Sequence, residues 1–87
     1  MNISAFSAKE LIKPEISYNN PVGISLLITS DDKLDRLRIF SVSGRKVFEK
    51  GLNTNSASVD LSTLPTGLYF IELTARNYIK IGKLLKE

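Results

Sequence analysis

Apolar and polar residues alternate along most of the chain after residue 14, with the period of a half-buried β-strand. The clearest case is the stretch around Tyr69, Ile71 and Leu73, where three large apolar side chains share one phase. Nothing in the pattern has the period of a long amphipathic helix. The alternation predicts seven short strands, at residues 15–18, 23–30, 34–42, 45–50, 57–61, 67–75 and 78–86.

Residues that favour turns separate these predicted strands. Asp31-Asp32-Lys33 predicts a polar turn, and residues 51–56 predict a polar connection rich in Asn and Ser. Ser43-Gly44 predicts a tight hairpin with glycine at a positive φ angle. Pro65 and Gly67 suit the second position and the end of a type I turn. Short strands at regular spacing with such turns are typical of an all-β sandwich or small barrel.

Two ends of the chain are less regular. Pro14 follows closely on a capping-box pattern at residues 7–10, so we expect residues 1–13 to be a linker or flexible arm and residues 14–87 to be the domain. Residues 1–10 lack the basic and apolar regions of a signal peptide. In the final strand, Gly82 indicates either a bulge that shifts the register or a strand covered on both faces.

Composition argues against an enzyme. The chain has no His and no Cys, which removes disulfides, thiolate metal sites and the side chains most used for proton transfer and covalent catalysis. We therefore expect no catalytic residues, no metal and no cofactor. Asp31, Asp32 and Asp35 match no calcium loop and indicate a polar hairpin end. Asp60 and Glu72 are expected to be solvated residues on strand faces rather than an acid–base pair.

The charge balance is mildly basic, with a net charge of +3 at pH 7 and no basic stripe, so we expect no nucleic-acid partner. Lys80, Lys83 and Lys86 in the final strand allow two interpretations. They protect a solvated edge strand against edge-to-edge pairing, or they form a contact patch for an acidic receptor. Alternatively the strand adds itself to a partner's sheet, with Leu84 or Leu85 filling pockets.

Stretches spread from residue 18 to residue 86 resemble one known family, the C-terminal sorting domain of the type IX secretion system, of the type A group. Residues 18–21, Tyr-Asn-Asn-Pro, resemble the family's opening Tyr-Pro-Asn-Pro, with Asn19 in place of the first proline. Residues 37–47 resemble its strand, glycine turn and valine, and residues 59–71 contain its Leu-Pro-x-Gly-x-Tyr run. Residues 83–86 are similar to its lysine-framed apolar pair.

The resemblance implies an immunoglobulin-like sandwich of antiparallel strands that carries a larger secreted protein through the periplasm and across the outer membrane. The implied partners are an N-terminal cargo domain, shuttle and translocon proteins of the outer membrane, and a sortase-like surface peptidase that removes the domain before the cargo is anchored at the surface. The residues that carry the sorting motif are Pro21, Gly44, Leu64, Pro65, Gly67, Tyr69, Lys83, Leu84, Leu85 and Lys86.

The residues themselves suggest a structural role for the central motif. Pro65 and Gly67 are explained by turn geometry, and we expect Tyr69 to lie in the core with its hydroxyl bonded to a backbone group. A rival hypothesis is a fibronectin-like adhesion or carbohydrate-binding module, which would share the fold without the sorting role. Sugar binding needs an aromatic platform, but the chain has no Trp and its three tyrosines lie on different predicted strands.

Overall fold

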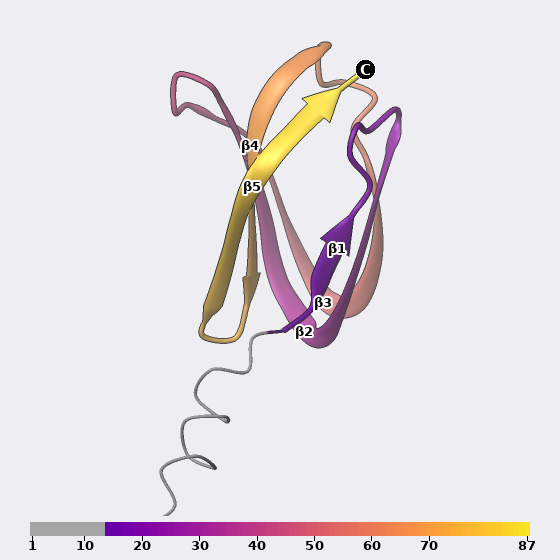
Figure 1. The fold of residues 1–87 in the computed structure, drawn as a ribbon, viewed down its shortest axis with the longest axis vertical. Coiled ribbons are helices and arrows are strands. Elements are labelled where there is room, and N and C mark those ends of the chain that lie inside the picture. Colours follow the sequence, from indigo (N-terminus) through magenta and orange to yellow (C-terminus); the bar gives the residue numbers. More distant parts are fainter. Residues whose placement is uncertain (1–13) are drawn as a thin grey trace, which may run out of the picture.

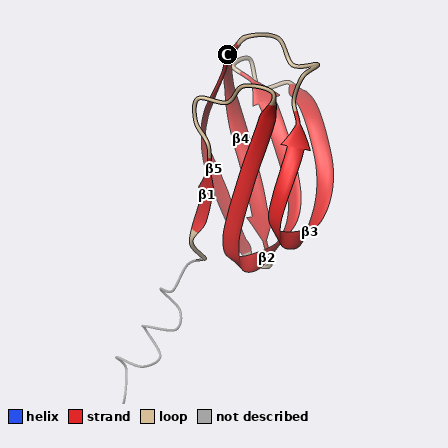
Figure 2. Ribbon diagram, turned by 90° about the vertical axis from the view of Figure 1, so that its right-hand side faces the viewer, coloured by secondary structure: helices blue, strands red, loops and turns tan. Residues whose placement is uncertain are grey.

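The computed structural model describes residues 14–87, so the expected arm at residues 1–13 lies outside the described residues. The described chain is all-β and antiparallel, as predicted (Figure 2). Within it, no helix has the length and apolar character to cross a membrane. The strands are β1 (Ile16–Tyr18), β2 (Ser25–Ser41), β3 (Lys46–Asp60), β4 (Gly67–Ala75) and β5 (Tyr78–Lys86).

The prediction of seven short strands is wrong, because two predicted turns are bends inside long strands. β2 runs for 17 residues through Asp31-Asp32-Lys33, and β3 runs for 15 residues through residues 51–56. Their pairing shifts register between Thr29 and Leu34, and Asn53 has a φ angle of 55°. Irregularities of this kind bend a β-hairpin without ending it. The two strands therefore form one long hairpin that curves through its polar middle (Figure 1).

All five strands belong to one sheet, so the two-sheet immunoglobulin-like sandwich is not the arrangement of residues 14–87. The strand order is β1-β2-β4-β5, and β3 pairs along the other edge of β2. Because β2 is so long, its first half pairs with β1 and its second half with β4. The sheet curls into a half-barrel (Figure 1). Its curvature lets a single sheet enclose a core.

The core lies inside this curl and contains the inward phase of each long strand. The predicted phase of Tyr69, Ile71 and Leu73 is confirmed. The phase expected for residues 23–30 holds for Leu26 and Ile28, whereas Ile24 precedes β2 and is exposed. Each buried side chain of this size contributes about 1.5–3 kcal/mol through the hydrophobic effect. The largest fully buried side chains are those of Leu26, Ile28, Leu34, Leu37, Ile39, Leu61, Ile71, Leu73, Leu84, Val22 and Val59.

β5 fits neither interpretation of Gly82. It pairs with β4 in one unbroken register, from Gly67 opposite Lys86 to Ala75 opposite Tyr78, so the strand contains no bulge. Its two faces also differ, because Leu84 is fully buried whereas Ile81 and Leu85 are exposed. The strand is thus covered on its inner face alone, and Gly82 needs another explanation.

Candidate functional site

The stretches that resemble the sorting family meet at one end of the molecule, the end marked C in Figure 1. Tyr69 pairs with Ser41 of β2 on one side and with Leu84 of β5 on the other. Val22, just after the Tyr-Asn-Asn-Pro stretch, forms an isolated parallel bridge with Lys86. We call this region, formed by residues 18–22, 41–45, 64–69 and 83–87, the motif end.

The Leu-Pro-Thr-Gly-Leu-Tyr run forms a closed turn at the start of β4. Leu64 is buried, and its N–H donates to the carbonyl of Leu61 at 3.0 Å. Gly67 has a φ angle of 155°, and the Tyr69 hydroxyl donates to the Pro65 carbonyl at 2.7 Å. The prediction of a core tyrosine with a backbone acceptor is confirmed. The side chains of this motif are therefore used to build the turn, which leaves Pro65 exposed at its tip.

The Ser43-Gly44 hairpin also matches its prediction. Gly44 has a φ angle of 90°, a conformation that residues with a Cβ rarely adopt. Its N–H donates to the Ser41 carbonyl at 2.9 Å, and the Ser41 N–H donates to the Arg45 carbonyl at 2.8 Å. Gly44 therefore acts through backbone geometry.

The Tyr-Asn-Asn-Pro stretch holds β5 along its second edge, the one that faces β1. The Tyr18 hydroxyl and the Asn20 side-chain amide both donate to the Lys83 carbonyl, at 2.9 Å and 3.2 Å. The Leu85 N–H donates back to the Asn20 side-chain oxygen at 2.8 Å. Asn20 thus satisfies one acceptor and one donor of β5 with a single amide, as a neighbouring backbone would.

Backbone bonds complete this contact. The Val22 N–H donates to the Leu85 carbonyl and the Glu87 N–H donates to the Val22 carbonyl, both at 2.8 Å. We call the contact of Tyr18, Asn20 and Val22 with residues 83–87 the seam. The seam joins the two sides of the curled sheet where the ladder between strands is absent.

Asn19 and Pro21 shape the chain that enters the seam. The Asn19 side chain donates to the Ser25 carbonyl at 3.1 Å and accepts from the Leu27 N–H at 2.8 Å. A proline at position 19, as in the family pattern, has no side-chain group for either bond. The Asn20–Pro21 peptide bond is cis, and Pro21 is exposed. Here the departure from the family pattern adds two anchoring bonds to β2.

Gly82 is explained by the Tyr18 ring, which lies against it. A Cβ atom at position 82 would overlap the Tyr18 hydroxyl oxygen, so the close approach of this ring requires glycine. Burial raises the pKa of the Tyr18 phenol above its usual value of 10.0. Sequence reasoning did not select Tyr18, Asn20 or Gly82 as site residues. A glycine within an otherwise regular strand was the available signal.

The three lysines of β5 do not form an exposed patch. The Lys80 ammonium donates inward to the Ile16 carbonyl at 2.9 Å. Lys86 is only 6% exposed and donates to the Glu87 carbonyl at 3.0 Å. Only Lys83 points to solvent. Both interpretations of the lysines assumed three solvated charges, and that assumption is wrong for Lys86.

Asp31 and Asp35, which the sequence offers as calcium ligands, and Asp60, which it offers as part of an acid–base pair, accept backbone N–H groups instead. Asp31 accepts from the Glu15 N–H at 2.6 Å, and Asp35 accepts from the Arg76 N–H at 3.0 Å. Asp60 accepts from the backbone N–H of Ser62 at 2.8 Å, which lowers the pKa of Asp60 below its usual 3.8. In the part of the chain that the structure describes, no three His, Cys, Asp or Glu side chains are grouped to hold a metal ion.

Comparison with known families finds the same family that the sequence motifs resemble. A family model described as the secretion system C-terminal sorting domain matches residues 17–87. The match runs from β1 through β5 and includes every residue of the motif end. A search of curated proteins gives no match.

Proposed function

The chain belongs to the family of C-terminal sorting domains of the type IX secretion system, and from this premise we propose that the machinery recognises the folded domain with β5 held in its seam, rather than a linear peptide. Members of this family are non-catalytic, and their cargo is secreted across the outer membrane. The observation that carries the proposal is that residues near the start of the domain, Tyr18, Asn20 and Val22, hold the strand at its end.

The hydrogen-bond pattern supports recognition of a shape. The Tyr69 hydroxyl donates a hydrogen bond to the Pro65 carbonyl, and the Tyr18 hydroxyl donates one to the Lys83 carbonyl. Leu84 is fully buried, so it is unavailable to a partner. A linear signal would need these side chains free for contact, whereas here they determine the position of β5. In this proposal the motif acts by shaping the surface that other proteins contact.

The further steps follow the type A pattern. Shuttle and translocon proteins of the outer membrane bind the domain in the periplasm and pass the N-terminal cargo to the surface. A sortase-like peptidase then cleaves ahead of the domain, and the cargo is anchored at the surface or released. Pro21, Gly44, Leu64, Pro65, Gly67, Tyr69 and residues 83–86 contribute through the geometry of the motif end.

The test is export of a reporter. The 87-residue chain is fused behind a periplasmic reporter in a host that has the type IX machinery. We expect the reporter at the cell surface, and we expect residues 14–87 alone to be sufficient. A reporter that remains periplasmic, with the attached domain intact and folded, would contradict the proposal. Export of a variant that lacks the seam contacts and is unfolded would instead show that a linear peptide is sufficient for recognition.

Nothing in the described residues favours the rival adhesion or sugar-binding module. Tyr69 is buried, and the Tyr18 ring is committed to the seam. Two of the three tyrosines are therefore unavailable for an exposed aromatic platform of the kind that stacks on sugars.

A further inference from the structure

The outward sides of β4 and β5, together with the second half of β2 and the first residues of β3, form one continuous surface, which we call the outer face. The register places Leu68 opposite Leu85, Phe70 opposite Lys83, and Glu72 opposite Ile81. On the other side of β4, Arg38 is opposite Glu72. Opposed residues in an antiparallel sheet point to the same side, so these side chains are neighbours.

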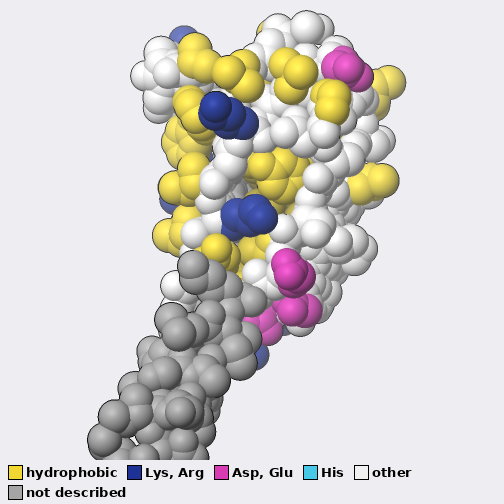
Figure 3. Space-filling model, in the orientation of Figure 1, with side chains coloured by type: hydrophobic (Ala, Val, Ile, Leu, Met, Phe, Trp, Pro, Cys, Tyr) yellow, Lys and Arg dark blue, Asp and Glu magenta, His cyan; other side chains and the backbone are white. Residues whose placement is uncertain are grey.

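This face carries a cluster of exposed aliphatic side chains. Leu68 and Leu85 are 45% and 44% exposed, and Ile79 and Ile81 are 52% and 67% exposed. Single exposed aliphatic residues are common, but four on two paired strands form a patch, and patches mark contact sites. Figure 3 shows hydrophobic side chains gathered along the margin of the molecule on the side of β5.

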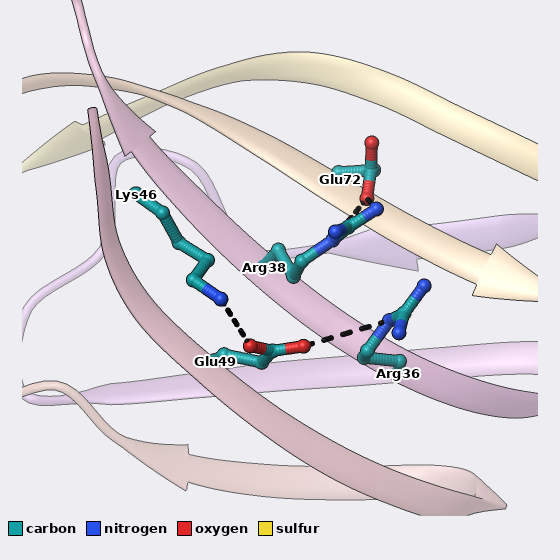
Figure 4. Close-up of polar contacts among 5 residues, drawn as sticks. All are labelled: Arg36, Arg38, Lys46, Glu49 and Glu72. Atoms are coloured by element: carbon teal, nitrogen blue, oxygen red, sulfur yellow. Dashed lines mark hydrogen bonds and ion pairs between the residues drawn. The ribbon is translucent and has the colours of Figure 1, made fainter. Parts of the chain in front are cut away.

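The outer face also carries charged side chains that are joined in ion pairs (Figure 4), and Glu72 lies opposite Ile81 of the patch. Arg38 binds the Glu72 carboxylate through Nε at 2.6 Å and Nη2 at 2.5 Å. Lys46 and Arg36 share the Glu49 carboxylate, at 2.5 Å and 3.8 Å. The bond from Lys46 is the main reason that the pKa of Glu49 lies below its usual 4.5.

The outer face has an excess of positive charge. Its four cations, Arg36, Arg38, Lys46 and Lys83, less its two carboxylates, Glu49 and Glu72, leave a net charge of +2. Among the described residues, Lys83 has no ion pair. It lies beside Phe70 in the register and is exposed within the apolar patch.

We propose that the outer face is the surface through which the domain docks, and that its partner is an apolar protein surface with acidic side chains, carried by a component of the type IX machinery. The inference rests on the proposed function and names its contact surface. A second copy of the chain fits poorly, because two faces of charge +2 would be brought together. An acidic rim would complement that charge and pair with Lys83.

This assignment connects the seam to docking. The seam fixes Lys83 and Leu85 through their backbone groups, which leaves the side chains of the outward phase in place on the outer face. Preorganisation of this kind lowers the entropy that is lost on binding. In this assignment the motif residues hold β5 in position, and the neighbouring side chains that point outward make the contact with the partner.

The first experiment compares two pairs of exposed aliphatic residues in the reporter fusion of the full chain. Ile79→Thr with Ile81→Thr alters the outer face and keeps β-branched side chains. Ile24→Thr with Leu27→Thr alters a site of similar exposure away from the face. We expect the first pair to lower surface reporter about tenfold, as hot-spot truncation does, and the control pair to leave it within about twofold. Equal export by both pairs overturns the inference.

Two further measurements keep the test decisive. If circular dichroism shows that the first pair is unfolded, Lys83→Glu replaces it, because Lys83 is exposed and has no ion pair among the described residues. We expect a several-fold loss of export, and unchanged export overturns the inference. If the unaltered chain fails to export, the proposed function fails and this inference fails with it. If the unaltered chain and the outer-face variant are both exported, the proposed function stands and the assignment of the docking surface is overturned.

The partner class is tested by cross-linking. Because the chain has no cysteine, Ile81→Cys gives a single reactive site on the outer face, and Leu27→Cys gives the matched control. We expect the first variant to cross-link to a component of the type IX machinery in the exporting host, and the control to give none of this product. Two outcomes would overturn the assignment to a protein partner of the machinery. One is binding to vesicles of phosphatidylethanolamine and phosphatidylglycerol through the outer face, and the other is dimerisation of the chain through the same face.

Discussion

The two edges of β5 are held in different ways. Along β4, an unbroken backbone ladder runs the full length of the strand, from Tyr78 to Lys86. Along the β1 side, the seam depends on the side chains of Tyr18 and Asn20 and on the backbone of Val22. A backbone ladder tolerates many sequences, whereas the seam requires particular side chains. Residues of the Tyr-Asn-Asn-Pro stretch therefore supply hydrogen bonds along the edge of β5 that has no neighbouring strand.

The largest effect should come from removing the side chain that packs β5 onto the core. Leu84→Ala deletes a fully buried side chain, and we expect the free energy of unfolding to fall by about 2–5 kcal/mol. Leu85→Ala is the matched control, since Leu85 is its exposed neighbour, and we expect a loss below about 1 kcal/mol. Urea denaturation measures both values. Equal losses would show that packing does not distinguish the two faces of the strand.

An intermediate effect should come from forcing the seam apart. Gly82→Ala places a Cβ against the Tyr18 hydroxyl, and we expect a loss of about 1–3 kcal/mol in the free energy of unfolding. Tyr18→Phe alone removes one hydrogen bond and should cost about 1 kcal/mol. Because the phenylalanine lacks the overlapping oxygen, the double variant should be more stable than the sum of the two losses predicts. Strict additivity in this cycle would refute the proposed overlap.

The smallest effect concerns alkaline pH. The pKa of Tyr18 is raised in the folded protein, so its contribution to stability is fully present below the unfolded value of 10.0 and is lost as pH rises through the folded pKa. We expect unfolding free energy to fall more steeply above pH 10 in the unaltered chain than in Tyr18→Phe. The comparison of the two chains removes the titration that they share, including that of the lysines. Parallel pH curves would contradict this role for the phenol.

The sequence predicted the features that depend on local chemistry. Alternation assigned the buried phase around Tyr69, and Gly44 indicated a positive φ angle, because both signals lie within a few residues. The continuity of β2 and β3 was not predictable in this way. Asp31-Asp32-Lys33 has the composition of a turn, but it lies within a strand whose flanking residues, Thr29 and Leu34, pair with distant residues of β3.

The seam escaped prediction for the same physical reason. Asn20 and Lys83 are 63 residues apart in the sequence, and no local pattern links them. The family resemblance located the motif end, but it did not show that Lys86 would be covered or that Gly82 would lie against Tyr18. Which lysine meets solvent is decided by strand phase, and strand phase in β5 was ambiguous until its register with β4 was known.

The bond between the Glu87 N–H and the Val22 carbonyl ties a late residue to an early one. During synthesis, the early half of this contact exists before its complement has emerged, so the sheet closes only after the ribosome has added residues 83–87. A polypeptide truncated before that point would lack Lys83, Leu85 and Glu87 together, and Tyr18, Asn20 and Val22 would keep no complement on β5. Closure of the domain therefore waits for residues 83–87, because they supply the groups that Tyr18, Asn20 and Val22 bind in the seam.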